Sequence, residues 1–198
     1  MIIIVYKRQQ RPFIDRALIG QYGEDITMKY LKDNNIKFED KRHIKQYQQD
    51  EIDFITYAKG KRQTVEVKAS EKNIHKYNSI MVKIHTTYDD EKERNTRGND
   101  SYLFRTKSDF LFYIDCVSKD IIVVKTKILQ EFLNANLKSL RVVIYQDNEE
   151  DASKSKYNRK NTVAYVPLNL IPENGIKRIK TNYKLNLNDF CEFSSKRQ

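Results

Sequence analysis

Two short runs of alternating character, joined by a glycine-containing turn, constrain the fold of this 198-residue chain more than any other feature. Residues 51–58 and 64–70 alternate apolar and polar side chains, which is the period of a β-strand. Gly60 lies between them and can adopt the positive φ that a tight reversal needs. The two runs predict a β-hairpin, and reflection through a turn near Gly60 brings position 53 opposite position 67.

Charged side chains interrupt these apolar strands. Asp53 lies on the first strand, and Glu66 and Lys68 project together from one face of the second strand beside it. Burial of such charges is costly unless they are compensated, and a divalent cation would compensate the two carboxylates. Mg²⁺ prefers hard oxygen ligands, here the carboxylates and the main-chain carbonyl of Val67, with room left for water and a phosphate oxygen. Lys68 would then polarise the attacking water and offset charge on phosphorus.

Asp53, the twelve-residue gap and Glu66-Val67-Lys68 resemble the signature of the PD-(D/E)XK nuclease superfamily. The resemblance covers residues 20–122 in order of elements and implies the restriction-endonuclease-like fold, an α/β domain with a mixed central sheet flanked by helices. It also implies Mg²⁺-dependent endonucleolytic hydrolysis of DNA, with Mn²⁺ as a substitute metal and 5′-phosphate and 3′-hydroxyl ends. Residues 105–113 resemble the strand that continues the core sheet. One departure is Ile52, which stands where the signature has Pro, at a position that varies widely in the superfamily.

In that superfamily a helix before the hairpin often supplies a further acid. Apolar residues at helical spacing predict an amphipathic helix over residues 14–35, and Glu24 in its first half is the matching candidate for metal binding and catalysis. Glu51 is a competing acid because it lies two residues before Asp53 on the same face, and Asp50 is a weaker one.

Other interpretations of these residues have less support. Two more acid-x-Lys triplets, at 39–41 and 90–92, lie in polar runs rather than on apolar strands, although an exposed Glu-Lys pair on a hairpin is an alternative reading of the chosen motif. The three histidines lack zinc-site spacing, and no phosphate-binding glycine loop or nucleophile elbow is present. Cys116 and Cys191 form no CxxC pair and are expected to be packed thiols.

The charge distribution indicates a nucleic-acid partner. The chain carries 37 Lys and Arg against 27 Asp and Glu, a net charge of +10, and residues 152–198 hold ten of the cations against three acids. The hairpin tip and the stretches 152–161 and 175–184 are therefore the expected phosphate contacts. These contacts are Lys59, Lys61, Arg62, Lys154, Lys156, Arg159, Lys160, Lys177, Arg178 and Lys180. DNA is the expected substrate, and nothing in the sequence separates it from RNA.

The chain is expected to form one nuclease-like domain, with a core over about residues 14–146 and a basic loop and tail over 147–198. Within this outline, residues 71–98 give little signal. The first segment, residues 1–6, is expected to be a strand, either at a sheet edge or as an oligomerisation arm. The remaining expectations are a short strand and loop at 37–50, strands at 110–117, 120–125, 140–146 and 162–168, a helix at 127–138, a mobile loop at 147–161 and an irregular basic tail.

No apolar run is long enough for a signal peptide or a membrane span, so a cytoplasmic protein without membrane contact is expected. A homodimer is left open, because many nucleases that cut two strands act as dimers. Restriction, junction resolution, homing and repair also remain open. The rival function is a catalytically inactive nuclease-fold module for DNA binding or assembly, whose affinity for DNA would be salt-sensitive but indifferent to Mg²⁺.

Overall fold

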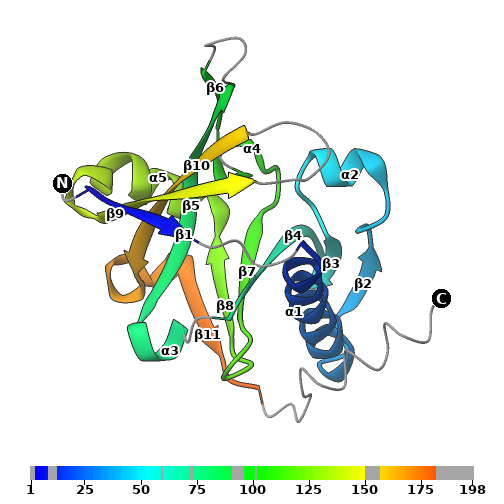
Figure 1. Ribbon diagram of the computed structural model, residues 1–198. Coiled ribbons are helices and arrows are strands. Elements are labelled where there is room, and N and C mark those ends of the chain that lie inside the picture. The colour runs from blue at the N-terminus through cyan, green and yellow to red at the C-terminus, as the bar shows by residue number, and fades with distance from the viewer. Residues whose placement is uncertain are drawn as a thin grey trace.

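Two β-sheets, packed together with helices around them, make up the computed structural model (Figure 1). It describes residues 3–8, 13–58, 60–71, 74–90, 96–100, 102–149 and 157–181. The predicted α/β class, with a mixed sheet flanked by helices, is confirmed. The division of the strands between two sheets was not predicted.

The first sheet has six strands in the order β11-β8-β7-β4-β3-β2. β2, β3 and β4 form an antiparallel meander, β7 lies parallel to β4, and β8 returns antiparallel to β7. The strand expected to continue the core sheet is therefore present as β7, directly beside the strand that carries Glu66 and Lys68. The strands are β2 (Lys37–Asp40), β3 (Phe54–Ala58), β4 (Lys61–Ser70), β7 (Phe110–Asp115), β8 (Ile121–Lys125) and β11 (Ile176–Ile179).

Helix α1 (Phe13–Asp33) packs on one face of this sheet, as the helical spacing predicts. Tyr22 and Ile26 are buried in the same cluster as Val67 of β4. Gly23 permits a close approach, because a Cβ atom at this position would lie 2.7 Å from the Cβ atom of Ala69. This close contact brings the first half of α1, including Glu24, next to the middle of β4.

The second sheet has five strands in the order β1-β9-β10-β5-β6 and packs on the opposite face of the first. Leu111 and Tyr113 of β7 share a buried cluster with Val82 of β5 and Ala164 of β10, and α5 (Thr126–Asn136) covers part of this cluster. β1 pairs in parallel with β9 at the sheet's edge, as the sequence predicts for the first strand. The strands are β1 (Ile3–Arg8), β5 (Ser79–Asp90), β6 (Thr96–Asp100), β9 (Arg141–Glu149) and β10 (Tyr157–Pro167).

Several local predictions were wrong where the backbone pairs in spite of polar side chains. The expected loop at 147–161 is described at residues 147–149 and 157–161, all of which lie in β9 and β10, paired antiparallel from Glu149 and Tyr157 onward; residues 150–156 lie outside the described residues. The expected irregular tail contains β11, which pairs with β8. Hydrogen bonds between strands join main-chain N–H and C=O groups whatever the side chains are, so the charge pattern alone did not predict these strands.

Short helices complete the described chain. Where a strand and a loop were expected at 37–50, the strand β2 is followed by the helix α2. Within the described residues, no helix is both long enough and apolar enough to cross a bilayer. The short elements are α2 (Lys45–Gln49), α3 (Ile74–Tyr77), α4 (Tyr102–Arg105) and the 3₁₀ turns Leu137–Ser139, Leu168–Leu170 and Glu173–Gly175.

Candidate active site

The hairpin brings the predicted acids together, with a register one residue different from the prediction. Phe54 pairs with Val65 and Ala58 pairs with Lys61, so the reversal is centred between positions 59 and 60 rather than on Gly60. β3 also begins at Phe54, so Asp53 immediately precedes the strand instead of lying in it. The Asp53 amide donates to the carbonyl of Val65 at 2.9 Å, which extends the ladder just far enough to fix this carboxylate beside β4.

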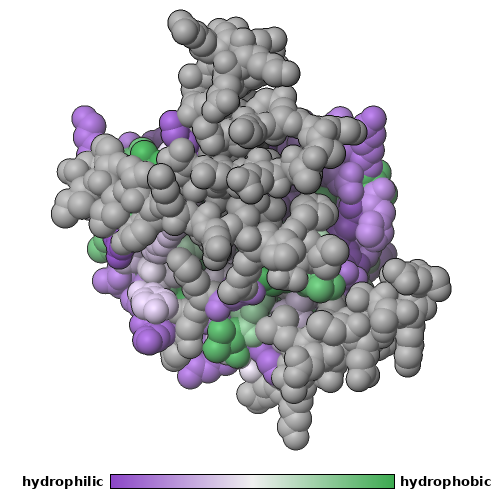
Figure 2. Space-filling view, in the orientation of Figure 1, coloured by the Kyte–Doolittle hydropathy of each residue, from purple (hydrophilic) through white to green (hydrophobic). Residues whose placement is uncertain are grey.

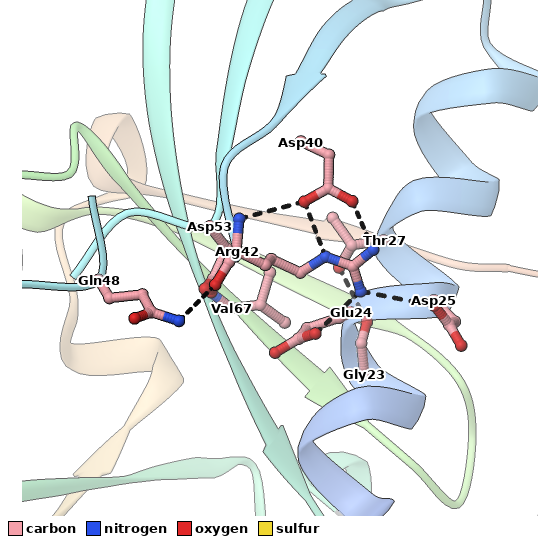
Figure 3. A network of polar contacts seen from close by, with 9 residues as sticks. All are labelled: Gly23, Glu24, Asp25, Thr27, Asp40, Arg42, Gln48, Asp53 and Val67. Atoms are coloured by element: carbon pink, nitrogen blue, oxygen red, sulfur yellow. Dashed lines mark hydrogen bonds and ion pairs between the residues drawn. The ribbon is translucent and has the colours of Figure 1, made fainter. Parts of the chain in front are cut away.

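Asp53 is held against the main chain of β4. Its Oδ2 atom accepts a hydrogen bond of 2.7 Å from the amide of Val67 (Figure 3). Burial raises the pKa of Asp53 above its ordinary range, although the Val67 amide and the ammonium group of Lys68 both oppose this shift. The carboxylate is therefore fixed in place while its negative charge is only partly compensated.

Glu66 and Lys68 project from the same face of β4, as alternation predicts, and form an ion pair. Glu66 is almost completely buried, with 4% of its surface exposed. Burial raises the pKa of Glu66 to about 8, the charge of Asp53 adds to the effect, and Lys68 acts against it. Burial alone would lower the pKa of Lys68, but the carboxylates of Glu66, Glu51 and Asp53 reverse this and raise it, so the lysine stays charged.

The acids line a cavity of about 350 Å³ between α1, the segment around α2, and the hairpin. Glu24 reaches this cavity from α1, as predicted, and burial raises the pKa of its carboxyl group. Glu51 lines the same cavity and lies 3.5 Å from Nζ of Lys68, with its backbone at a positive φ of 55°. Both candidates for the additional acid therefore face the site. In Figure 2 mainly hydrophilic side chains cover the region where α2 lies in Figure 1.

Arg42 is a site residue that the sequence analysis missed. Its guanidinium group lies 2.9 Å from Glu24, 2.6 Å from Asp40 and 3.6 Å from Asp25, and it lies over the ring of Phe54 (Figure 3). Hydrogen bonding to Arg42 holds the pKa of Asp40 below its usual range. No sequence signal distinguished Arg42 from its charged neighbours, because its partners come from a helix 17 or 18 residues earlier and from the adjacent strand.

The predicted nucleic-acid contacts do not gather at this cavity. Lys61 and Arg62 are exposed at the start of β4, about 16 Å and about 13 Å from Glu66 at ~3.3 Å per residue. Lys177 and Arg178 are exposed on β11, at the opposite edge of the sheet from β2, and Lys180 follows them. Lys160 lies in β10 of the second sheet. The remaining predicted contacts, Lys59, Lys154, Lys156 and the side chain of Arg159, lie outside the described residues.

The donor set fits Mg²⁺ better than a metal that needs a complete protein cage. Among the described residues, no group of three or more His, Cys, Asp or Glu side chains converges tightly enough to enclose an ion. Mg²⁺ commonly binds one or two carboxylates and takes its other ligands from water and substrate phosphate. Asp53 and Glu66 form such a pair, and burial raises the pKa of each, so a cation bound between them would offset the cost of burying their charge.

Comparison with known proteins gives two distant structural likenesses. No family model and no curated protein matches the chain. A bacterial homing endonuclease superposes with a TM-score of 0.42 and 14% identity over 57% of this chain and 70% of that chain. A nuclease from a fusselovirus superposes with a TM-score of 0.33 and 10% identity over 83% of this chain and 89% of that chain. Both TM-scores are below 0.5, a likeness too distant to assign a fold family or an activity.

Proposed function

We propose that the protein is a metal-dependent endonuclease of the PD-(D/E)XK type that hydrolyses phosphodiester bonds, with DNA as its substrate. One observation carries the proposal: the buried carboxylate of Glu66 and the half-buried carboxylate of Asp53 meet beside the ammonium group of Lys68 at a cavity. A purely structural Glu-Lys pair is expected at an exposed position, where it costs little. Here Glu66 is buried, Lys68 is half-buried, and a further acid lies beside them, which is costly unless the site has a use for it.

Each residue has a defined task in this proposal. Asp53 and Glu66 would hold Mg²⁺, with the main-chain carbonyl of Val67 as a further ligand. That carbonyl points to the same edge of β4 as the Val67 amide, which already contacts Asp53. The bound ion would lower the pKa of water and neutralise charge on the phosphate oxygens.

Lys68 supplies the cation that the protein itself contributes. Its position against Glu66 and Glu51 keeps it protonated, so it can orient an attacking water and stabilise the negative charge that develops on phosphorus. Glu24 lies across the cavity and is restrained by Arg42, which suits it to position a metal-bound water or a second ion. Arg42 is thus a positioning residue in this scheme.

The test is cleavage of plasmid, linear duplex, branched DNA, single strands and RNA in Mg²⁺, Mn²⁺ or EDTA. Glu66→Ala and Lys68→Ala should each reduce the cleavage rate by at least about 100-fold, the range reported for removal of a general acid–base or an electrostatic catalyst. The matched control is the exposed pair Lys127 and Glu131 on α5, whose nitrogen and oxygen lie 4.0 Å apart. Changing that pair to Ala should leave cleavage unchanged.

Cleavage that persists in EDTA, or that survives both Glu66→Ala and Lys68→Ala, would overturn the proposal. Salt-sensitive DNA binding without cleavage, unaffected by Mg²⁺ and by Asp53→Ala, would support the rival function as an inactive binding module.

A further inference from the structure

A second cavity lies along the same strand as the candidate active site. It has a volume of about 620 Å³ and is lined by Ser70, the last residue of β4. Glu66, Lys68 and Ser70 follow one another at two-residue spacing, so their side chains project from one face of the strand. At ~3.3 Å per residue, Glu66 and Ser70 lie about 13 Å apart.

The buried core gives independent support for this placement. Leu111 and Tyr113 of β7 are the ladder partners of Glu66 and Lys68, and both belong to the cluster that joins the two sheets. Ile74 and Leu140 belong to the same cluster and also line the second cavity. The cavity therefore lies on the face of the first sheet to which the catalytic row of β4 points, at the junction with the second sheet.

Two tyrosines and an arginine lie among the mostly aliphatic and serine side chains of the lining. Tyr77 is 62% exposed although it is a large aromatic residue, and Leu170 beside the same cavity is 51% exposed. The guanidinium group of Arg141 lies 5.2 Å from the ring centroid of Tyr165, and Nζ of Lys76 lies 5.5 Å from that of Tyr77. Exposed aromatic surface with cations on its rings is suited to a flat, polar-edged ligand that carries negative charge nearby.

Hydroxyl groups complete this chemistry. Ser70, Ser79 and Ser139 line the cavity from three different segments of the chain. The edge of a nucleobase offers both donors and acceptors to hydroxyl groups, which a purely apolar ligand or lipid chain does not. A nucleobase also has a π-face for Tyr77 and an adjacent phosphate for Arg141.

We propose that this cavity receives an unpaired nucleobase of the substrate strand whose phosphodiester bond lies at the Asp53–Glu66 site. This proposal rests on the proposed function. The separation of about 13 Å corresponds to roughly four stacked nucleotides at ~3.4 Å each, and to fewer in an extended strand. The protein would therefore prefer a strand with an unpaired base near the cut, such as a single-stranded, bulged or branched segment, because a paired base must first be unpaired and unstacked.

The test uses 2-aminopurine, a fluorescent adenine analogue, placed in turn at each position of a single-stranded oligonucleotide. The full chain is added in EDTA, so that binding is read without cleavage. A fluorescence change at one or two adjacent positions is expected, and Tyr77→Ala should weaken the binding that produces it about tenfold, within the range of base–aromatic stacking. Phe104→Ala is the matched control, because Phe104 is 40% exposed on α4 and does not line the cavity.

Three further arms identify the occupant. A duplex with a single bulged 2-aminopurine should give the same Tyr77-dependent signal, and a fully paired duplex should give a weaker one. The free 2-aminopurine deoxynucleotide should compete for the site. The proposal is overturned if no oligonucleotide position responds, if the response is unchanged in Tyr77→Ala, or if an apolar dye binds the cavity and nucleotides do not displace it. Because these readings need no cleavage, they stand apart from the outcome of the nuclease assay.

Discussion

Replacing Glu66 by Gln should change the pH dependence of stability in the metal-free protein. Burial and the charge of Asp53 raise the pKa of Glu66 from 4.5 to about 8, so between these pH values the folded protein binds a proton that the unfolded chain has released. The free energy of unfolding must therefore fall as pH rises through this window, by about 1.4 kcal/mol per pH unit. From pH 4.5 to pH 8 the loss from this group reaches about 5 kcal/mol at most, and it levels off above pH 8.

Gln is nearly the same size as Glu and does not titrate, so Glu66→Gln removes this contribution. Asp53 and Glu24 also have raised pKa values and act in the same direction, so a shallower fall should remain in the variant. The measurement is urea unfolding followed by circular dichroism between pH 5 and pH 8.5 in EDTA. Glu131→Gln is the control, because the side chain of Glu131 is 65% exposed.

Addition of Mg²⁺ sharpens this experiment. A cation between Asp53 and Glu66 should oppose the loss of stability at pH 8, by about 2.7 kcal/mol when its concentration is a hundred times the dissociation constant. The same addition should have much less effect on Glu66→Gln. If the free energy of unfolding falls equally steeply with pH in the wild type and in Glu66→Gln, the assignment of a buried carboxyl group with a raised pKa at position 66 is refuted.

The remaining predictions concern packing and the polar network around the site. Gly23→Ala should lower the free energy of unfolding by about 1–3 kcal/mol, because the new Cβ atom would lie 2.7 Å from that of Ala69. A Cβ atom at Gly20 would meet nothing within 4 Å, so Gly20→Ala should be neutral or stabilising in the same urea titration. Arg42→Gln should destabilise the protein by about 2 kcal/mol at pH 7, and by less near pH 3. The reason is that Arg42 lowers the pKa of Asp40 in the folded protein. The stability that this interaction contributes is present above the ordinary pKa of Asp and is lost as pH falls through the lowered pKa of Asp40. Urea unfolding at pH 7 and at pH 3 checks this, and an equal loss of stability at both pH values would contradict the reasoning.

The sequence by itself determined the local geometry of β4, the strand that carries Glu66 and Lys68. Strand alternation is a property of neighbouring residues, so placing Glu66 and Lys68 on one face required only that this run be a strand. The hairpin likewise brought Asp53 beside them in spite of the one-residue error in register, because its side chain reaches the main chain of Val67 from the first position before β3. Glu24 was also predicted to reach the site, because helical periodicity predicts α1 and the resemblance to the nuclease signature implies an acid on that helix.

The tertiary structure alone decided what surrounds that strand. Arg42 meets Glu24 because the loop after β2 folds back onto α1, and no pattern in the charged stretch marks that contact. β9 and β10 pair through polar residues because ladder hydrogen bonds join main-chain groups and are indifferent to side-chain charge. The cavity at Ser70 is lined by residues from separate segments between positions 70 and 170, which become neighbours only when the second sheet packs on the first. Side-chain direction along one strand follows from backbone stereochemistry, whereas contacts between distant segments depend on how whole elements bury their apolar faces.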